Sequence, residues 1–357
     1  MSKKIRAAVI GCGSWAREAH LPALAQHPQA DIVALVDPDM QARTEAAQLF
    51  NVAQTYSDAK DLYAQQDVDV VVVATPHSTH FGAACDALNA GAHVLIEKPM
   101  VLDPEDGQRL MRLAADRGKE IIVGYPLHYN EQALQLRSAI ADGKLGKLEF
   151  VSCLFASLVR DYYGGDTSTY QSEFNFVRAP RNETYSDPVL SGGGQGQTQV
   201  THSAALLFWL TGLQPQSVTA FCENFSLPVD LVDAAAVRFA GGTLGTIGST
   251  GGRPPSGVDL LEIRVFGTAG AIFFDVFEGN AVLKVGSRTE TFRVIDAADR
   301  YPLLSPARNL VDVALGVHPN GSAAAIGQLT ASFLHAMYES AAKDGMPIEI
   351  LRQPLGL

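Results

Sequence analysis

The first 126 residues of the chain alternate short apolar runs with longer amphipathic stretches. The apolar runs are rich in β-branched residues: IRAAVI, DIVALV, VDVVVVA, AHVLIE and KEIIVG. Near-continuous runs of this kind are typical of parallel strands that helices cover on both faces. Two amphipathic stretches, 81–90 and 104–117, are followed by Gly91 and Gly118, and glycine is common just after a helix end. The pattern predicts a doubly wound α/β domain at residues 1–126.

After residue 126 the rhythm changes to that of strands joined by short turns. A helix at 131–141 precedes about eight strand-like runs. Among them are 147–157, 217–226, 232–240, 243–249, 258–266 and 271–276. Turns such as Gly241-Gly242 and Glu278-Gly279-Asn280 are typical of β-hairpins. Residues 127–357 are therefore expected to form an α+β domain with a large, mainly antiparallel open sheet. Two late helices, 305–316 and 322–343, are expected to pack on this sheet or on the first domain.

Composition agrees with two domains of an ordinary globular protein: 357 residues, 47% hydrophobic and 18% charged. The formal net charge of -11 argues against a nucleic-acid partner, because such binding relies on Lys and Arg. No apolar run approaches the roughly 20 residues that span a bilayer, so we expect no membrane partner and a cytoplasmic location. Cys12, Cys85, Cys153 and Cys222 lack CxxC spacing, which predicts reduced thiols and no metal site.

The segment VIGCGSWA carries a phosphate-binding pattern. Gly11, Gly13 and Ala16 form G-x-G-x-x-A between the first strand and a helix. Gly11 allows the tight turn, and Gly13 admits a pyrophosphate to the backbone. The helix N-terminus, with Ser14 and Trp15, would face the phosphates. The pattern predicts a Rossmann domain, with an incidental strand-turn-helix as the alternative.

An acidic residue stands where such a domain binds the adenosine ribose. Asp37 ends the second strand about 26 residues after the first glycine. It would accept hydrogen bonds from the ribose and repel a 2′-phosphate. The sequence therefore favours NAD over NADP, although the nearby Arg43 weakens that preference.

Two further motifs follow apolar strands: ATPHSTH at 74–80 and EKPM at 97–100. Both fall at the carboxyl edge of the predicted sheet, where ligands bind in open α/β folds. With the glycine turn, these motifs resemble the family of glucose-fructose oxidoreductase, inositol dehydrogenase and rhizopine-catabolism proteins (Gfo/Idh/MocA). The resemblance covers nearly the whole chain and includes DGKLGKLEFV at 142–151 and GGG…H…WLTG at 192–212.

The resemblance implies cofactor contacts for the first of these motifs. Ala74, Thr75 and Pro76 would line the nicotinamide side of the cofactor. His77 and His80 belong to the same loop and are further cofactor-binding candidates. The alternative for His80 is that it caps the helix that follows.

The second motif carries the first catalytic candidate. By the same resemblance, Glu97 would contact the cofactor ribose and Lys98 would point at the reacting hydroxyl. An ammonium suits this role because it donates hydrogen bonds to an alcohol or a developing alkoxide, and burial can lower its pKa. The alternative for Lys98 is a surface cation at a strand end.

The stretch GGGQGQTQVTH places His202 at the start of an apolar helix. In the family this segment usually carries an aspartate and, four residues later, a histidine on the same helical face. His202 matches the histidine, Thr198 takes the aspartate's place, and Ala205 stands where a further acidic residue is common. Without a carboxylate, His202 is expected to stay neutral more readily and to accept a proton, with a core histidine as the alternative. Glycines 192–194 would let the helix start pass close to substrate, beside neutral hydrogen bonds from Thr198 and Gln199.

Aromatic and polar residues elsewhere are candidates for the substrate pocket. Tyr125, His128 and Tyr129 follow the fifth strand, a segment that the resemblance places beside nicotinamide or substrate. The insertion RDYYGGDTSTY at 160–170 has the composition of a loop that closes a sugar site, with Tyr162 and Tyr163 as its candidates. The alternative is an exposed loop.

The resemblance implies an NAD-dependent dehydrogenase that acts on a carbinol of a sugar, sugar derivative or cyclitol, with Lys98 and His202 as catalytic residues. Because the aspartate is replaced, a redox-assisted glycosidase or lyase that recycles tightly bound NAD is the alternative. A non-catalytic nucleotide-binding sensor is a third reading, which the two catalytic candidates argue against. Strands with apolar residues on both faces, VDAAAVRFA and LLEIRVFG, predict a homodimer or homotetramer formed through the outer face of the sheet.

Overall fold

The computed structural model describes residues 4–169, 171, 179–254, 257 and 259–350. The chain divides into two compact units. The first holds Met1–Pro126, Thr167–Thr184 and Leu303–Gln328, and the second holds Leu127–Asp166, Tyr185–Pro302 and Leu329–Leu357. Two segments that follow residue 126 therefore group with the first unit.

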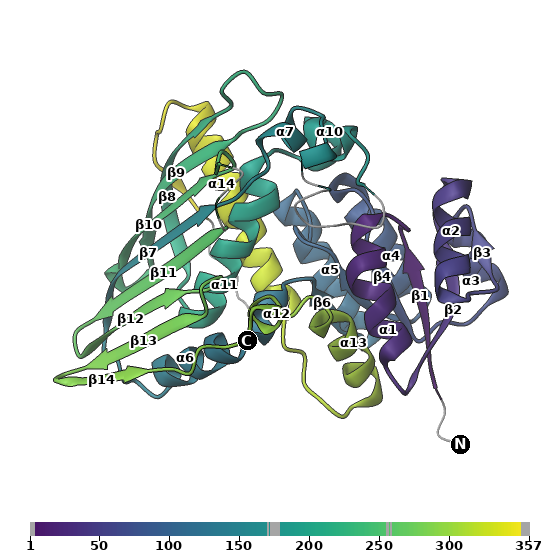
Figure 1. The fold of residues 1–357 in the computed structure, drawn as a ribbon, viewed down its shortest axis with the longest axis horizontal. Coiled ribbons are helices and arrows are strands. Elements are labelled where there is room, and N and C mark those ends of the chain that lie inside the picture. The colour runs from purple at the N-terminus through teal and green to yellow at the C-terminus, as the bar shows by residue number, and fades with distance from the viewer. Residues whose placement is uncertain (1–3, 170, 172–178, 255–256, 258, 351–357) are drawn as a thin grey trace. The chain divides into compact units, whose positions relative to one another are not determined.

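A parallel sheet of six strands forms the centre of the first unit (Figure 1). In spatial order its strands are β3 (Thr55–Tyr56), β2 (Ala30–Val36), β1 (Ile5–Ile10), β4 (Val70–Val73), β5 (His93–Ile96) and β6 (Ile121–Val123). The order changes direction between β1 and β4, which is the switch point beside which doubly wound sheets bind ligands. The sheet confirms the predicted doubly wound α/β fold.

Helices cover both faces of this sheet. They are η1 (Ala16–His20), α1 (Leu21–Gln26), α2 (Met40–Phe50), α3 (Ala59–Gln65), η2 (His77–Thr79), α4 (His80–Asn89), α5 (Pro104–Arg117) and α13 (Ser305–Leu315). Local signals set the ends of α5, where the Asp103 side chain accepts a hydrogen bond from the Glu105 N–H and Gly118 ends the helix at φ 60°. These are the bounds that the amphipathic pattern predicts.

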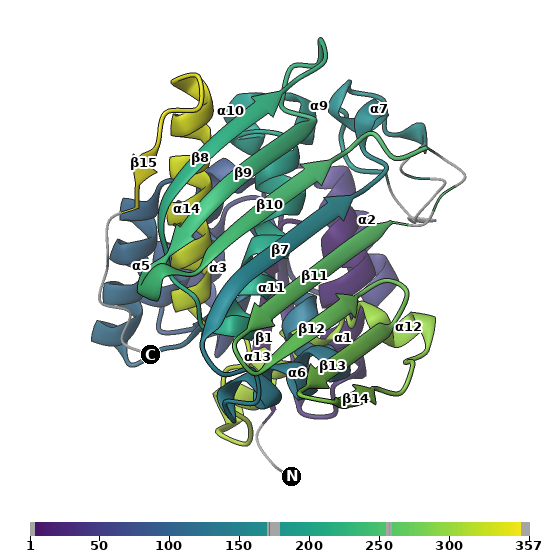
Figure 2. The same cartoon turned by 90° about the vertical axis from the view of Figure 1, so that its left-hand side faces the viewer.

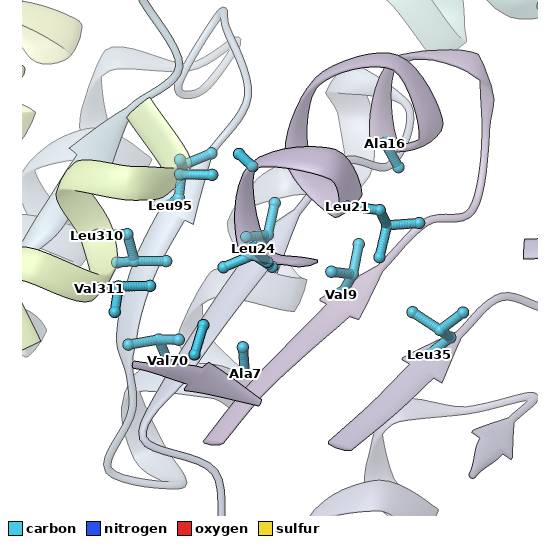
Figure 3. Close-up of a cluster of buried hydrophobic side chains, with 14 of the residues drawn as sticks. Ala7, Val9, Ala16, Leu21, Leu24, Leu35, Val70, Leu95, Leu310 and Val311 are labelled. Carbon is cyan, nitrogen blue, oxygen red and sulfur yellow. The ribbon is translucent and has the colours of Figure 1, made fainter. Parts of the chain in front are cut away.

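The apolar core on one face joins residues that lie far apart in the chain (Figure 3). Val9 of β1, Val70 of β4 and Leu95 of β5 share a cluster with Leu24 of α1 and Leu310 of α13. All five side chains are buried. Burial of one such side chain stabilises the fold by roughly 1.5–3 kcal/mol. The apolar face of α13 thus explains why its segment groups with the first unit.

A sheet of nine strands forms the second unit (Figure 2). In spatial order its strands are β14 (Arg288–Thr291), β13 (Asn280–Val285), β12 (Gly270–Asp275), β11 (Leu260–Gly267), β7 (Leu148–Ala156), β10 (Leu244–Thr250), β9 (Val232–Phe239), β8 (Pro215–Glu223) and β15 (Ile348–Glu349). Only β7 and β10 pair in parallel among these described strands. Gly241 and Gly242 turn β9 into β10 at φ 82° and 90°. The predicted large, mainly antiparallel sheet is confirmed.

The remaining helices belong to the second unit or contain a boundary between the units. They are η3 (Pro126–Tyr129), α6 (Glu131–Ala141), α7 (Arg160–Tyr163), α9 (Glu183–Ser186), α10 (Pro188–Ser191), η4 (Gly196–Val200), α11 (Thr201–Thr211), η5 (Ala240–Gly242), α12 (Ala297–Arg300) and α14 (Ala324–Ala342). Phe208 of α11 packs edge-on against Phe239 of β9 and Phe333 of α14, with ring centroids 6.1 and 5.5 Å apart. Figure 2 shows α11 and α14 behind the sheet, and none of the labelled helices of this unit crosses the face turned to the viewer.

Three further features concern the described residues alone. None of their helices combines the length and the apolar character needed to cross a membrane. The four cysteines are free thiols. No group of three or more His, Cys, Asp or Glu side chains is arranged to hold a metal ion in these ranges.

Candidate functional site

Two glycines shape the turn after β1. Gly11 has φ +94°, and a Cβ atom added there would lie 2.3 Å from the carbonyl oxygen of Ala74, so only glycine fits where β1 and β4 end. Gly13 is exposed, and apart from its chain neighbours a Cβ added to it would meet no described atom within 4 Å. Ser14 and Trp15 follow and are half-buried. The backbone at Gly13 therefore borders open space at a helix start, which fits a bound pyrophosphate.

The carboxylate of Asp37 is fixed just beyond β2. Its Oδ2 atom accepts a hydrogen bond from the Cys12 N–H at 2.8 Å, and Oδ1 accepts one from the Asp39 N–H at 2.8 Å. Arg43 of α2 donates to the backbone carbonyl oxygens of Asp37 and Pro38 at 3.1 and 3.2 Å. The structure thus places an acid and an arginine close together beside the glycine turn.

His80 connects the two motifs at the carboxyl edge of the parallel sheet. Its ring is buried, with Nδ1 2.8 Å from the Pro99 carbonyl oxygen and Nε2 2.9 Å from the Thr75 carbonyl oxygen. Burial lowers the pKa of His80, although both carbonyl oxygens oppose the shift. His77 is also buried, with its ring centroid 5.6 Å from that of His80. His80 therefore joins segment 74–80 to segment 97–100, a structural role beyond starting α4.

Glu97 is held from three sides. Its Oε1 atom accepts a hydrogen bond from the Trp15 indole N–H at 2.9 Å and lies 2.8 Å from Nε2 of His20. Its Oε2 atom accepts the Lys98 backbone N–H at 3.1 Å. Burial alone would raise the pKa of Glu97, but the hydrogen bond and attraction of His20, with Lys98, hold it below the usual value. A Cβ at Gly124 would lie 2.5 Å from Oε1, so glycine there makes room for the carboxylate.

Lys98 follows Glu97 just after β5 and is half-buried. Burial lowers the pKa of its ammonium, and the Glu97 carboxylate opposes this shift. A lysine with a lowered pKa exchanges protons near neutral pH more readily than an exposed one. The side chain therefore has the electrostatic setting that its predicted role needs.

A neutral hydrogen-bond network surrounds Thr198 in η4. Its hydroxyl donates to the Gly194 carbonyl oxygen at 2.9 Å and is hydrogen-bonded to the Tyr163 hydroxyl. Tyr163 also donates to Oε1 of Gln195 at 3.0 Å, and the Gln195 amide donates to Ser249 of β10 at 2.7 Å. Thr198 is therefore tied to β10 and α7 by side chains without charge.

His202 is the second residue of α11 and is buried. Its ring stands edge-on to that of Tyr301, with centroids 6.0 Å apart and an angle of 67°. Gln199, one turn earlier, is half-buried. Of the two predicted catalytic residues, Lys98 lies in the first unit and His202 in the second.

His128 lies in the packing around α11. Its ring stacks on Trp209, with centroids 4.8 Å apart and an angle of 8°. Burial lowers its pKa to about 3, despite a hydrogen bond with the Ala205 backbone, so the ring is neutral at physiological pH. These contacts are typical of a core histidine. Contact of His128 with substrate stays a prediction, as it does for the buried Tyr125 of the first unit.

Tyr162 is buried, so the alternative of an exposed loop is wrong at this position. It lies in the short helix α7, edge-on to Tyr185 with ring centroids 4.9 Å apart. Tyr170, at the end of the predicted insertion, lies outside the described residues.

Two family models match most of the chain. The model described as "Oxidoreductase family, NAD-binding Rossmann fold" matches residues 5–125, and that of the "GFO/IDH/MocA C-terminal domain" matches residues 133–273. This chain belongs to the Gfo/Idh/MocA family. It is an NAD-binding oxidoreductase, and the predicted resemblance is confirmed.

Relatives within the Gfo/Idh/MocA family are distant. The rhizopine catabolism protein MocA of Rhizobium meliloti is 28% identical over 288 residues, which cover 78% of this chain and 82% of MocA. Inositol 2-dehydrogenase of Corynebacterium glutamicum is 31% identical over 150 residues, 42% of this chain and 44% of that enzyme. The crystal structure of GenD2 from gentamicin A biosynthesis, in complex with NAD, matches with a TM-score of 0.80 and 26% identity, over 99% of this chain and 98% of GenD2. Six other curated relatives are matched over only 24–52% of their own length.

Sequence reasoning missed one residue that contacts a predicted site residue, and it named a second without its partner. His20 ends η1 and reaches Glu97, yet the two residues are 77 positions apart. Its only local signal is a histidine one helical turn after Ala16 of the glycine pattern. Tyr163 is one of the two tyrosines named in the insertion, but its hydrogen bond with Thr198 could not be read from the sequence.

Proposed function

We propose that this protein is an NAD-dependent dehydrogenase that transfers hydride between the nicotinamide and a carbinol of a sugar, sugar derivative or cyclitol. The observation that carries the proposal is Lys98, half-buried after β5 with a lowered pKa, next to a Glu97 carboxylate that Trp15 and His20 hold in place. The name of one relative, inositol 2-dehydrogenase, supports a cyclitol.

Each proposed site residue would have a separate role in the oxidation of an alcohol. Bound NAD would supply the hydride acceptor. Gly13 and the start of η1 would hold its pyrophosphate, and Asp37 its adenosine ribose. Lys98 would donate a hydrogen bond to the reacting hydroxyl and stabilise the developing alkoxide, while His202 would accept the hydroxyl proton. Loss of the O–H proton to His202, together with loss of the C–H hydride, would turn the carbinol into a ketone or aldehyde.

A substrate screen tests the proposal directly. The purified protein is incubated with NAD or NADP and a panel of inositols, aldoses, glycosides and sugar acids, and reduced cofactor is followed at its absorbance maximum. The proposal expects turnover with at least one polyol and its loss in Lys98→Ala. Binding of NAD without turnover of any polyol, and without bond cleavage, would favour the sensor reading instead.

The neutral network around Thr198 favours a second candidate, a redox-assisted glycosidase or lyase. The Thr198 hydroxyl is bonded to the Tyr163 hydroxyl at the position where the family resemblance implies an aspartate. Proton chemistry without that carboxylate would suit such an enzyme. In that reaction a transient ketone would acidify the neighbouring C–H, elimination would follow, and the hydride would return to the substrate. Cleavage of a glycoside without net formation of NADH would identify this candidate.

We also propose that two copies associate through the outer face of the nine-stranded sheet. On that face Phe150 of β7 is 39% exposed and pairs with Leu244 of β10 (47% exposed) and Phe266 of β11 (37%). The Phe150 and Phe266 rings lie 6.4 Å apart. Three large apolar side chains side by side on an uncovered sheet face favour burial against a second copy.

A further inference from the structure

A buried carboxylate in the second unit binds the glycine turn that leads to His202. Asp230 lies in the segment before β9 and is 5% exposed. Its Oδ1 atom accepts the Gly194 N–H at 2.7 Å, and its Oδ2 atom accepts the Gly196 N–H at 2.8 Å. Its own carbonyl oxygen accepts the Gln195 N–H at 2.9 Å. One residue therefore receives three consecutive backbone N–H groups of the turn.

Close packing against this residue explains why the turn is made of glycines. A Cβ at Gly194 would lie 2.1 Å from the Asp230 carbonyl oxygen. A Cβ at Gly193 or Gly196 would lie 2.4 or 2.3 Å from the Tyr338 hydroxyl. That hydroxyl itself donates to Asp230 Oδ1 at 3.0 Å. The glycines make room for Asp230 and Tyr338, whereas the sequence suggested only room for substrate.

A second acid lies in the same cluster but has a different setting. Asp233 of β9 is 2% exposed, and its carboxyl group interacts with Cys222 and Asp230 rather than with the turn. Burial, and then the charge of Asp230, raise the pKa of Asp233 well above its usual value. Asp230, in contrast, receives three hydrogen bonds on its carboxylate. Of the two acids, Asp230 is therefore the one whose carboxylate binds the turn.

We propose that Asp230 is a positioning residue for the reaction, which fixes the backbone at 194–196 and thereby the placement of Thr198 and His202. The route is short, because the Thr198 hydroxyl donates to the carbonyl oxygen of Gly194, the residue whose N–H Asp230 binds. His202 lies four residues after Thr198 in the continuous helical stretch η4–α11. This inference rests on the proposed function for its catalytic effect, but the effect on the turn is independent of it.

Two matched substitutions in the same buried cluster test the proposal. Asp230→Asn keeps the side-chain volume but turns one acceptor into an amide donor that faces a backbone N–H. Asp233→Asn makes the same change three residues away, at a side chain that receives no bond from the turn. We expect Asp230→Asn to lower kcat about tenfold or more, since one acceptor for a backbone N–H of the turn is lost, with KM for NAD unchanged. Asp233→Asn is expected to leave kcat unchanged.

Two readouts separate positioning from general destabilisation. In the His202→Ala background, Asp230→Asn should lower the residual turnover by much less than it does in the wild type, because both changes act through one group. Hydrogen-deuterium exchange of peptides spanning 194–202 should be faster in Asp230→Asn and unchanged in Asp233→Asn. If Asp230→Asn does not fold, Tyr338→Phe replaces it in both measurements. This variant removes a single donor to Asp230, so it should produce the same pattern more weakly.

The outcomes are distinguishable. Equal loss of kcat in both Asn variants, or unchanged exchange at 194–202 in Asp230→Asn, overturns the positioning role. If the wild-type protein oxidises no polyol, the proposed function fails, while the exchange experiment still decides whether Asp230 fixes the turn.

Discussion

His20 and Glu97 are joined by a buried contact of 2.8 Å between Nε2 and Oε1, and this contact ties the glycine-turn helix to the residue before Lys98. The other ring nitrogen of His20 is buried and has no hydrogen-bond partner among the described residues. Among the described residues, His20 therefore contacts Glu97 through Nε2 alone. The helix that is proposed to hold pyrophosphate thus also contacts the carboxylate next to Lys98.

Removal of this contact is expected to destabilise the protein. His20→Ala leaves a buried carboxylate with one partner fewer and should lower the free energy of unfolding at neutral pH by about 3 kcal/mol. His20→Gln keeps a donor and should recover part of that loss. Chemical denaturation of the three proteins measures the difference. Equal unfolding free energies for His20→Ala and wild type would show that the contact contributes nothing.

The same contact predicts a pH dependence. The pKa of Glu97 in the folded protein is lowered relative to its usual value, so the unfolded chain binds this proton more readily. The stabilisation from the ionised carboxylate is present above the unfolded pKa of about 4.3 and is lost as the pH falls through the folded value. Glu97→Gln should remove this part of the acid sensitivity. Unfolding curves at several pH values between about 3 and 7 would show it.

Local signals along the chain predict the ends of helices but not the contacts between distant residues. The bounds of α5 follow from local signals, since Asp103 and Gly118 act on neighbouring backbone groups. The contacts of His20 with Glu97 could not be predicted this way, because they depend on how β1 and β5 are placed in the sheet. Sequence distance hides such pairs, and only the fold brings them together.

The glycine run before His202 is a second feature whose contacts the sequence could not predict. The sequence predicts close approach at 192–194 without naming what approaches. The structure supplies Asp230 and Tyr338, which come from other elements of the second unit. Thr198 was expected to offer neutral hydrogen bonds, and it does so toward Tyr163, whose position in α7 no local pattern indicates. Whether it also contacts substrate stays a prediction.

Cofactor preference is predicted to rest on Asp37. The wild-type protein should bind NAD more tightly than NADP, because a 2′-phosphate would meet the carboxylate beside the glycine turn. Asp37→Asn removes the charge, keeps the size and should narrow the difference. Arg43→Ala is the matched control and should widen it. Titrations of both nucleotides measure the affinities, and equal or reversed affinities in the wild type would contradict the assignment.

The catalytic assignment predicts unequal effects at three positions. Lys98→Ala and His202→Ala should each lower turnover by roughly 100-fold or more, the usual scale for acid–base groups, while NAD still binds. Thr198→Ala should lower turnover much less, by the equivalent of about 1 kcal/mol in activation free energy, since only a neutral hydrogen bond is lost. Steady-state kinetics with the substrate from the screen decide the order. Near-normal turnover in His202→Ala would make this histidine structural.

Association through the outer sheet face predicts a response to charge. Phe150→Asp places a carboxylate among Leu244 and Phe266 and should shift the protein toward the monomer. Met40→Asp is the control, since Met40 is 69% exposed at the start of α2 in the first unit. Light scattering at micromolar concentration gives the mass of each protein. A monomeric wild type, or equal masses for wild type and Phe150→Asp, would exclude this interface.

Asp233 gives the last prediction, with a sign opposite to that of Glu97. Its pKa in the folded protein is raised by burial and by Asp230, so the folded state binds this proton more tightly than the unfolded chain. Below the unfolded pKa of about 3.9, Asp233 is protonated in both states and does not change the free energy of unfolding. As the pH rises above that value, the unfolded chain loses the proton first, so the free energy of unfolding falls. Asp233→Asn removes the acid and should be more stable than the wild type at pH 7, with the difference shrinking toward pH 4. Thermal unfolding across this range measures the effect, and a variant less stable than the wild type at pH 7 would mean that the ionised carboxylate has a stabilising partner in the fold.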